Sequence, residues 1–303
     1  MVFELTILGS SSALPTKKRY PSAHVLNAHE RFFLIDCGEG TQMQLRRYGI
    51  KYGRIHHIFI SHLHGDHVFG LYGLLSSMNL SGRESPLSLY APEGFDQILF
   101  SHLSDFDIHL NFEVNFVPLH GNDPIHIYDN KYITVVSFPL KHRVPTYGFL
   151  FREKQKERNI LKEAVREYKI PVSEIHRIKK GYDFIGPGGK IIPNSEITVD
   201  PPAPRSFAYC SDTMYFKRLP GFVSGVDLLY HEATFASDNK SLAAKTGHST
   251  SEQAARVALD AGAGRLVIGH FSARYKDVSD LLKEAQVIFP DTIAAADGAV
   301  IQV

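Results

Sequence analysis

Residues 59–70 read FISHLHGDHVFG and place four metal-ligand side chains within six positions. These side chains are His62, His64, Asp66 and His67. The apolar run HHIFIS leads into them, so the segment reads as a strand that ends in a loop, and Gly65 permits a tight backbone there. Imidazole and carboxylate groups suit zinc and similar divalent ions, and alternate residues of an extended chain share one side. The stretch therefore predicts a metal site at the end of a strand.

Further ligands are expected at the ends of other strands, because four ligands from one loop seldom complete a site. His142 follows VVSFPLK, Asp212 follows SFAYCS and His270 follows RLVIG. Each of these residues alone would be an ordinary polar residue at a strand end. Together with the first cluster they exceed the needs of one tetrahedral ion, and they suit two ions that share a bridging carboxylate.

The composition is that of an ordinary globular chain, with 303 residues, 44% of them hydrophobic, and a formal net charge of +1. This length suits one large or two modest domains. The near-neutral charge gives no global indication of a nucleic-acid partner, so any such indication must be local. Only two cysteines occur, Cys37 and Cys210, which favours a reducing compartment. Without signal-peptide features or an apolar run of ~18–20 residues, we expect a cytoplasmic protein with no membrane segment.

Short apolar strands recur along the chain, and segments with helical spacing lie between some of them. In residues 251–262, SEQAARVALDAG, Gly262 is a natural C-terminal stop, and Ser249 with Glu252 fits a capping box at the start. Strands predominate and the chain ends on one. This pattern favours sheets that are covered by helices on their outer faces.

The segment 152–181 breaks this pattern through its charge. It contains ten Lys or Arg and five Asp or Glu, about +5, which leaves 23 basic and 27 acidic residues on the rest of the chain. A solvated surface helix would explain such a run of charges. The asymmetry also fits a basic protrusion that binds an anionic partner.

SHLHGDH matches the HxHxDH signature of the metallo-β-lactamase superfamily, and the chain resembles that superfamily from LTILGSSSALP to DGAVIQV. The resemblance implies an αββα sandwich, in which two facing mixed sheets carry outer helices and hold the metals at one edge. It also implies how the ligands divide. One zinc ion would be held by His62, His64 and His142, a second by Asp66, His67 and His270, and Asp212 would bridge the two.

Within that superfamily, several segments resemble RNase Z, a family of tRNA 3′-processing endonucleases. PTKKRYPS is similar to the PxKxRN loop of that family, with Tyr20 in place of the usual Asn. The other similar segments are LIDCGEGTQMQL (34–45), HEATF (231–235), GHST (247–250) and GHFSARY (269–275). The resemblance implies that precursor tRNA is cut on the 3′ side of the discriminator, which leaves a 3′-hydroxyl on the tRNA and a 5′-phosphate on the trailer.

The same resemblance suggests roles for individual residues. Two zinc ions would activate a water for attack on phosphorus, and Asp66 would orient or deprotonate that water. His248 would protonate the leaving 3′ oxygen, and His231 would support a metal ligand. The basic residues expected to contact tRNA phosphates are Lys17, Arg19, Lys179 and Lys180.

We therefore expect a single metallo-β-lactamase-like domain over 1–303, with a flexible tRNA-binding arm inserted over 152–205. The resemblance also implies a homodimer. Two other functions are compatible with a two-metal site on this fold. One is a hydrolase of small phosphodiesters or esters, related to arylsulfatases or lactonases. The other is a nucleic-acid-binding protein whose metal site is only structural.

Overall fold

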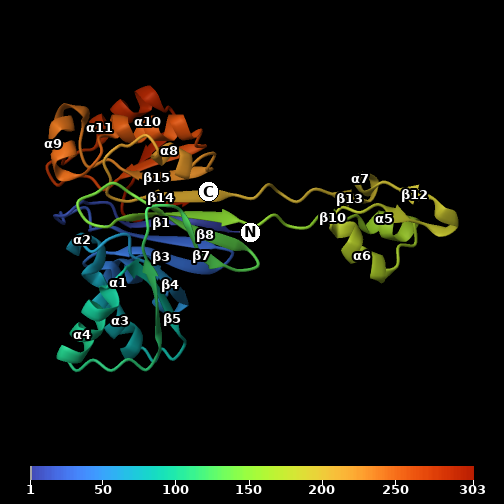
Figure 1. Ribbon diagram of the computed structural model, residues 1–303, viewed down its shortest axis with the longest axis horizontal. Coiled ribbons are helices and arrows are strands. Elements are labelled where there is room, and N and C mark those ends of the chain that lie inside the picture. Colours follow the sequence, from blue (N-terminus) through green and yellow to red (C-terminus); the bar gives the residue numbers. More distant parts are fainter. Residues whose placement is uncertain (1) are drawn as a thin grey trace. The chain divides into compact units, whose positions relative to one another are not determined.

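The computed structural model describes residues 2–303 and divides into two compact units (Figure 1). The first unit combines the chain up to Arg152 with Arg205–Val303, and the second is Glu153–Pro204. None of the helices within residues 2–303 is both long enough and apolar enough to cross a membrane. Each unit has its own hydrophobic core and is described separately below.

The first sheet of the larger unit is mixed and has the strand order β18-β1-β2-β3-β4-β5-β6. Its strands are β1 (Phe3–Gly9), β2 (Ala23–Ala28), β3 (Arg31–Cys37), β4 (Ile55–Phe59), β5 (Leu87–Pro92), β6 (Val114–Leu119) and β18 (Val300–Gln302). The pairs β18-β1, β1-β2 and β2-β3 are antiparallel, whereas β3-β4, β4-β5 and β5-β6 are parallel. The carboxyl ends of β3, β4 and β5 therefore meet at one edge.

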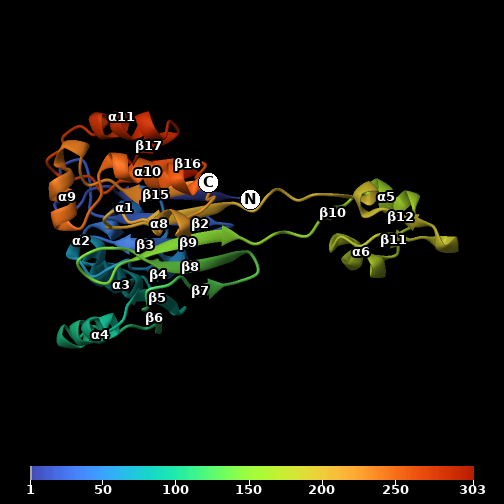
Figure 2. The same ribbon diagram turned by 45° about the horizontal axis from the view of Figure 1, so that its top comes forward.

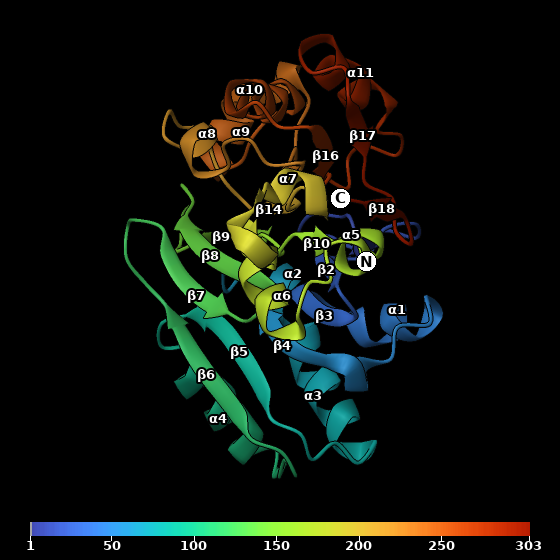
Figure 3. The same cartoon turned by 90° about the vertical axis from the view of Figure 1, so that its right-hand side faces the viewer.

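The second sheet is also mixed and has the order β17-β16-β15-β14-β9-β8-β7. Its strands are β7 (Ile125–Asp129), β8 (Ile133–Pro139), β9 (Tyr147–Glu153), β14 (Ser206–Cys210), β15 (Leu228–Glu232), β16 (Arg265–Gly269) and β17 (Thr292–Ala294). Strands β14 to β17 run parallel, and β9 pairs antiparallel with β14. Figure 3 shows the two layers, with β4, β5 and β6 in one and β7, β8 and β9 in the other.

The inner faces of the two sheets pack through aromatic rings. Phe33 and Phe59 of the first sheet meet Phe151 of the second, with ring centroids 5.6 and 5.5 Å apart. Such edge-to-face pairs add to the free energy of apolar burial. The main core therefore lies between the sheets and contains residues of both.

Helices cover both outer faces (Figures 1 and 2). The helices of the larger unit are α1 (Thr41–Arg47), α2 (Gly65–Val68), α3 (Gly70–Leu80), α4 (Phe95–Asp105), α8 (Leu219–Phe222), α9 (Lys240–Thr246), α10 (Ser251–Ala261) and α11 (Ser279–Ile288). Helices α1, α3 and α4 pack on the first sheet through a second apolar cluster, and α10 packs on β15 and β16 of the second sheet. This architecture is the expected αββα sandwich, and the fold prediction is confirmed.

The capping box of α10 lies one residue later than the sequence suggested. Thr250 is the N-cap: its hydroxyl accepts from the Gln253 backbone N–H, and the Gln253 side chain accepts from the Thr250 N–H. Ser249, the expected cap, instead donates to the carbonyl oxygen of Thr213. Gly262 ends the helix in the left-handed conformation, as predicted.

The smaller unit has two antiparallel strand pairs, β10-β13 and the hairpin β11-β12, three short α-helices and a core of its own. Its elements are β10 (Asn159–Ile160), α5 (Lys162–Glu167), α6 (Val172–Lys179), β11 (Phe184–Ile185), β12 (Ile191–Ile192), α7 (Asn194–Ile197) and β13 (Thr198–Val199). The core contains Ala164, Ile170, Ile178, Phe184, Ile192 and Ile197. The buried Asn194 amide ties the unit together, because it donates to the carbonyl oxygens of Ile178 and Tyr182.

Candidate metal centre

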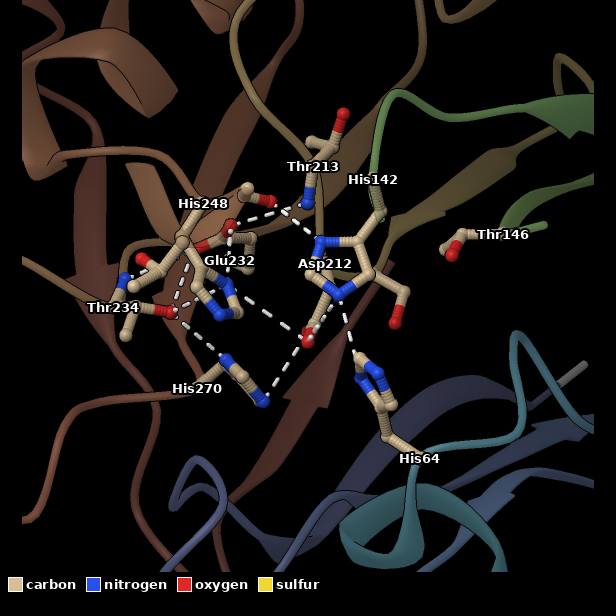
Figure 4. A network of polar contacts seen from close by, with 12 residues as sticks. His64, His142, Thr146, Asp212, Thr213, Glu232, Thr234, His248 and His270 are labelled. Carbon is tan, nitrogen blue, oxygen red and sulfur yellow. Dashed lines mark hydrogen bonds and ion pairs between the residues drawn. The ribbon is translucent and has the colours of Figure 1, made fainter. Parts of the chain in front are cut away.

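The seven predicted metal ligands come from the ends of strands in both sheets and lie together. The segment after β4 carries His62 and His64, and the adjoining α2 carries Asp66 and His67. The other three follow strands of the second sheet: His142 after β8, Asp212 after β14 and His270 after β16. Their nitrogen and oxygen atoms form two neighbouring groups, in each of which all the atoms lie within 4.8 Å of one another. Figure 4 shows several of these side chains converging.

The first group surrounds the Nδ1 atom of His64. This atom lies 3.0 Å from Nε2 of His62 and 3.3 Å from Nε2 of His142. One oxygen of Asp212, Oδ2, lies 3.5 Å from Nε2 of His62 and 3.8 Å from Nε2 of His142. Three imidazoles and a carboxylate oxygen thus face a common point.

The second group surrounds the Nε2 atoms of His67 and His270, which lie 3.2 Å apart. The Oδ2 atom of Asp66 is 3.4 Å from the first nitrogen and 3.3 Å from the second. The other oxygen of Asp212, Oδ1, is 3.4 and 3.2 Å from the same two nitrogens. Asp212 therefore turns one oxygen to each group.

These spacings fit divalent ions such as zinc. A tetrahedral zinc ion with bonds of about 2.0–2.1 Å places its ligand atoms about 3.3–3.4 Å apart, as they are in the second group. The Oδ1 atom of Asp212 is buried and has no hydrogen-bond partner among residues 2–303. A buried carboxylate oxygen without a donor indicates that a cation belongs beside it.

Hydrogen bonds on the far side of the rings direct the ligand nitrogens inward. The Nδ1–H of His67 donates to Asp36 Oδ2 at 2.7 Å, and the Nδ1–H of His142 donates to the Gly247 carbonyl at 2.6 Å. The Nδ1 of His270 lies 2.9 Å from the hydroxyl of Thr234. These contacts leave Nε2 of each ring with its lone pair toward the group, which is the arrangement that a metal ligand needs.

Asp36 is a supporting residue that the sequence reasoning missed. It is fully buried at the end of β3 and adopts a left-handed backbone with a φ of 56°. Its carboxylate accepts from the backbone N–H and hydroxyl of Ser61, from the Tyr209 hydroxyl and from His67. The carboxylate therefore orients one ligand directly and holds the backbone next to His62. Its place near the end of the apolar run RFFLID was visible in the sequence, whereas the pairing of β3 with β4, the strand that precedes the first ligands, was not.

Burial and charge set the protonation of the ligands in ways that favour cation binding. Burial lowers the pKa values of His62, His64 and His142, which keeps these rings neutral. Burial acts to raise the pKa of Asp66, but the charges of His67 and His270 outweigh it and hold that pKa well below its ordinary value. The first group thus offers three neutral imidazoles. Burial also acts to lower the pKa of His67, but the carboxylates of Asp66, Asp212 and Asp36 outweigh it and raise that pKa well above its ordinary value, so this ring must give up a proton when it binds a cation.

His248 lies beside both metal groups and pairs with a buried carboxylate (Figure 4). Its Nδ1 is 3.1 Å from Oε1 of Glu232, a fully buried side chain that also accepts from the backbone N–H groups of Thr213, Thr234 and Ser249. Burial alone would lower the pKa of His248. The carboxylates of Glu232 and Asp212 prevail and raise it to about 9. These carboxylates therefore favour the protonated form of the ring.

The structure differs from the sequence expectation at His231, which was expected to support a ligand. Its Nδ1 donates to the backbone carbonyl of Glu232 at 2.6 Å, and its Nε2 is buried without a hydrogen-bond partner in residues 2–303. Successive side chains of a strand point to opposite faces, so the neighbour Glu232 reaches the site instead. The hydroxyl of Thr234, which contacts His270, also binds Glu232.

A cavity of about 650 Å³ opens onto the two groups. Its lining includes five of the predicted metal ligands and His248: His64, Asp66, His142, Asp212, His270 and His248. Phe69 and Arg143, which are not predicted metal ligands, also line it. The loop that contains Pro15 contributes another part of the wall. A cavity of this size accepts a small ligand or one segment of a polymer.

The four residues expected to contact tRNA phosphates have different surroundings. Lys17 and Lys180 are exposed. Lys179 lies 3.6 Å from the carboxylate of Glu157. The guanidinium of Arg19 donates to the backbone carbonyls of Tyr275 at 2.7 Å and Ser272 at 3.4 Å, and burial lowers its pKa. The guanidinium of Arg19 therefore already forms hydrogen bonds within the protein, unlike the exposed Lys17 side chain.

Known proteins resemble this chain along nearly its full length. Residues 197–271 match the family model of the beta-lactamase superfamily domain, and residues 3–160 match that of the anti-Pycsar protein Apyc1. Ribonuclease Z of Bacteroides thetaiotaomicron is 48% identical over 301 residues, which cover 99% of this chain and 95% of that protein. Ribonuclease Z of Cytophaga hutchinsonii is 45% identical, with coverages of 99% and 96%. Among solved structures, the short form of human tRNase Z superposes with a TM-score of 0.71, 28% identity and 99% coverage of both chains.

Proposed function

The chain belongs to the ribonuclease Z family, and from this premise we propose a zinc-dependent endoribonuclease that cleaves precursor tRNA on the 3′ side of the discriminator. Membership makes the chain a tRNA 3′-processing endoribonuclease. The proposal adds the cut position, the identity and number of the ions, and the residues that act. One observation carries the chemistry: two groups of histidine and aspartate atoms share Asp212 and lie beside His248, which pairs with the buried Glu232 carboxylate.

Two zinc ions per chain fit the donor set. His62, His64 and His142 would hold one ion, and Asp66, His67 and His270 would hold the other. Asp212 would bridge them through its two oxygens. When bound, the ions would lower the pKa of a water and offset negative charge on the phosphate oxygens.

The residues of the chain orient the attacking water and supply the proton. Asp66 lines the cavity, where its carboxylate can accept a hydrogen bond from the attacking water. The water oxygen forms a bond to phosphorus as the bond from phosphorus to the 3′ oxygen breaks. His248 lies on the same cavity and donates its proton to that 3′ oxygen. The tRNA then ends in a 3′-hydroxyl, and the trailer carries the 5′-phosphate.

The inserted arm over 152–205 is the second part of the proposal. We assign it the binding of the tRNA body, with Lys179 and Lys180 contacting phosphates and Lys17 contacting the strand near the metal centre. Lysine neutralises phosphates regardless of base sequence, which suits a substrate recognised mainly by its shape. The basic excess of residues 152–181 supports this role.

The proposal also includes a cytoplasmic homodimer. The dimer rests on the resemblance to the family. The location is supported by the two cysteines, which are buried free thiols, a state typical of reducing compartments. Sedimentation of the purified protein at several concentrations would measure the oligomeric state.

A cleavage assay with metal analysis of the same sample tests the function. The purified protein should carry two zinc ions per chain and cut a precursor with a 3′ trailer once, directly after the discriminator. If the precursor stays intact while small phosphodiesters are hydrolysed, the small-molecule hydrolase is the better assignment.

Asp66→Ala separates a catalytic metal centre from a structural one. We expect this variant to lose cleavage and still bind precursor tRNA, because Lys17 and the proposed contacts of the arm remain. Unchanged cleavage would show that the metal centre has no catalytic part.

A further inference from the structure

Phe69 is an exposed aromatic residue on the wall of the metal cavity. It follows α2, two residues after the ligand His67, and 64% of it is exposed. It lines the cavity together with Asp66 and His142. A single exposed apolar residue is common on protein surfaces, so its place beside the reaction centre is what makes this one informative.

The ring rests on the loop that carries the metal ligands. A Cβ atom added to Gly65 would lie 2.3 Å from Cε2 of Phe69 and 2.6 Å from its Cδ2, so the ring packs directly against the glycine backbone. Gly65 stands between the ligands His64 and Asp66 in the chain. Consecutive Cα atoms are about 3.8 Å apart, so the ring lies within one residue of ligands from both groups. One edge of the ring therefore contacts the backbone, while most of the residue stays exposed.

A second aromatic residue of the cavity, Phe235, is not available in the same way. Phe235 is only 5% exposed, and the guanidinium of Arg274 lies 5.0 Å from the centre of its ring. Of these two phenylalanines, only Phe69 therefore exposes enough of its side chain to contact a ligand in the cavity. An exposed cation, Arg143, also lines the cavity and suits the phosphates of such a ligand.

We propose that Phe69 is a stacking platform for the base of one of the two nucleotides that flank the scissile phosphate. The inference rests on the proposed function, which supplies a single-stranded RNA segment at the metal centre. Single-stranded RNA is recognised through bases that stack on aromatic side chains, and the contact tolerates any base. A ring fixed to the ligand loop would hold the nucleotide, and so align its phosphate with the metal centre.

The test combines Phe69 variants with precursor tRNAs that lack one base. The substrates are an intact precursor, one that is abasic at the discriminator and one that is abasic at the first trailer nucleotide. For wild type, one abasic substrate should lower kcat/KM by about ten- to a hundredfold, the range of a base–aromatic stack. Phe69→Ala should show the same loss on the intact precursor and no further loss on that abasic substrate, whereas Phe69→Trp should restore cleavage.

Two further variants separate stacking from structural effects. Phe69→Leu keeps an apolar side chain over Gly65 but has no aromatic face, so it should bind zinc and melt as wild type does yet cleave as poorly as Phe69→Ala. Phe106→Ala is the matched control, because Phe106 is 68% exposed and does not line the cavity. It should cleave all three substrates at wild-type rates.

Several results would overturn the inference. The first is full activity of Phe69→Ala or Phe69→Leu on the intact precursor. The second is a Phe69→Ala variant that lowers kcat/KM on each abasic substrate by the same factor as on the intact precursor, whether the discriminator or the first trailer base is missing. The third is a changed oligomeric state of Phe69→Ala. The last result would assign the ring to a contact between subunits. Failure of the proposed function looks different, because wild type itself would then leave the intact precursor uncut.

Discussion

His248 differs from the predicted metal ligands His62, His64 and His142 because carboxylates determine its charge. Its pKa is raised to about 9 by Glu232 and Asp212, although burial opposes this. Burial instead lowers the pKa values of the predicted ligands His62, His64 and His142, which favours their neutral form. One cluster therefore contains both groups able to hold a cation and a group able to give up a proton.

Replacing His248 with alanine should slow cleavage of precursor tRNA by about 10²–10⁴-fold, the usual contribution of a general acid. The loss should nearly vanish on a phosphodiester with a p-nitrophenolate leaving group, because that group departs without a proton. Single-turnover rates on the two substrates measure the difference. His109→Ala is the control, since that side chain is 86% exposed. Equal losses on both substrates would exclude proton donation by His248.

Lys17 and Arg19 lie two residues apart and should behave differently when each is replaced by alanine. Arg19 donates to the backbone of the loop that follows His270, so Arg19→Ala should lower the melting temperature and kcat. Lys17 is exposed, so Lys17→Ala should raise KM at unchanged stability and reduce the salt dependence of tRNA binding by about one phosphate contact. Thermal melts and titrations at several salt concentrations decide between them. Identical effects of both variants would contradict the assignment.

At the residue scale, the sequence located candidate ligands better than the residues that support them. Four ligand-type residues within six positions are unusual in themselves, so the first cluster was visible without a structure. Asp36 and Glu232 look like any other acidic residue in a sequence. Their roles depend on β3 lying beside β4 and on the side to which β15 turns Glu232, which only the folded chain specifies.

At the element scale, the pairing of β9 with β14 isolates the inserted segment. The two strands run antiparallel, and Arg152 faces Ser206 across the pair. The ends between which the segment is inserted are therefore neighbours in the sheet. A two-residue turn can join antiparallel strands at such a point, and Asn-Gly is the preferred sequence.

Replacing Glu153–Arg205 with Asn-Gly should therefore leave the larger unit folded. The variant should lose most of its activity on precursor tRNA, through a higher KM, because the proposed contacts of Lys179 and Lys180 are gone. Hydrolysis of a small phosphodiester should stay within about twofold of wild type. Circular dichroism and zinc content show whether the fold survives. Parallel losses on both substrates would give the segment a structural role instead of a tRNA-binding one.

The elements also show where sequence patterns reach their limit. Alternating strands and helical segments predicted the layers, since apolar periodicity reflects which face is buried. The start of α10 was placed one residue early, because Ser249 and Thr250 both precede the helix and both suit an N-cap. The hydroxyl of Ser249 is used by the Thr213 carbonyl across the fold, a contact that local sequence does not reveal.

At the scale of the whole molecule, the predicted metal ligands come from both sheets. His62 and His64 follow a strand of the first sheet, whereas His142, Asp212 and His270 follow strands of the second. Ions bound between them would link the sheets at one edge, so metal binding should add to the free energy of unfolding. The predicted ligands span more than 200 positions of the sequence, from His62 to His270, so such ions would connect segments that are distant along the chain.

Removing the metal should therefore lower the stability of the larger unit. At free zinc about 100 times above the dissociation constant, each site adds about 2.7 kcal/mol, so loss of both should lower the melting temperature by roughly 10 °C. Scanning calorimetry of chelated and zinc-restored protein measures how much bound zinc raises the melting temperature.

Two variants divide this gain in stability between the sites. His64→Ala should keep the gain contributed by the second group, because the predicted ligands Asp66, His67 and His270 remain. Asp212→Ala should lose most of the gain, since its two oxygens serve both groups. A full gain in Asp212→Ala would mean that the two ions bind without a shared ligand.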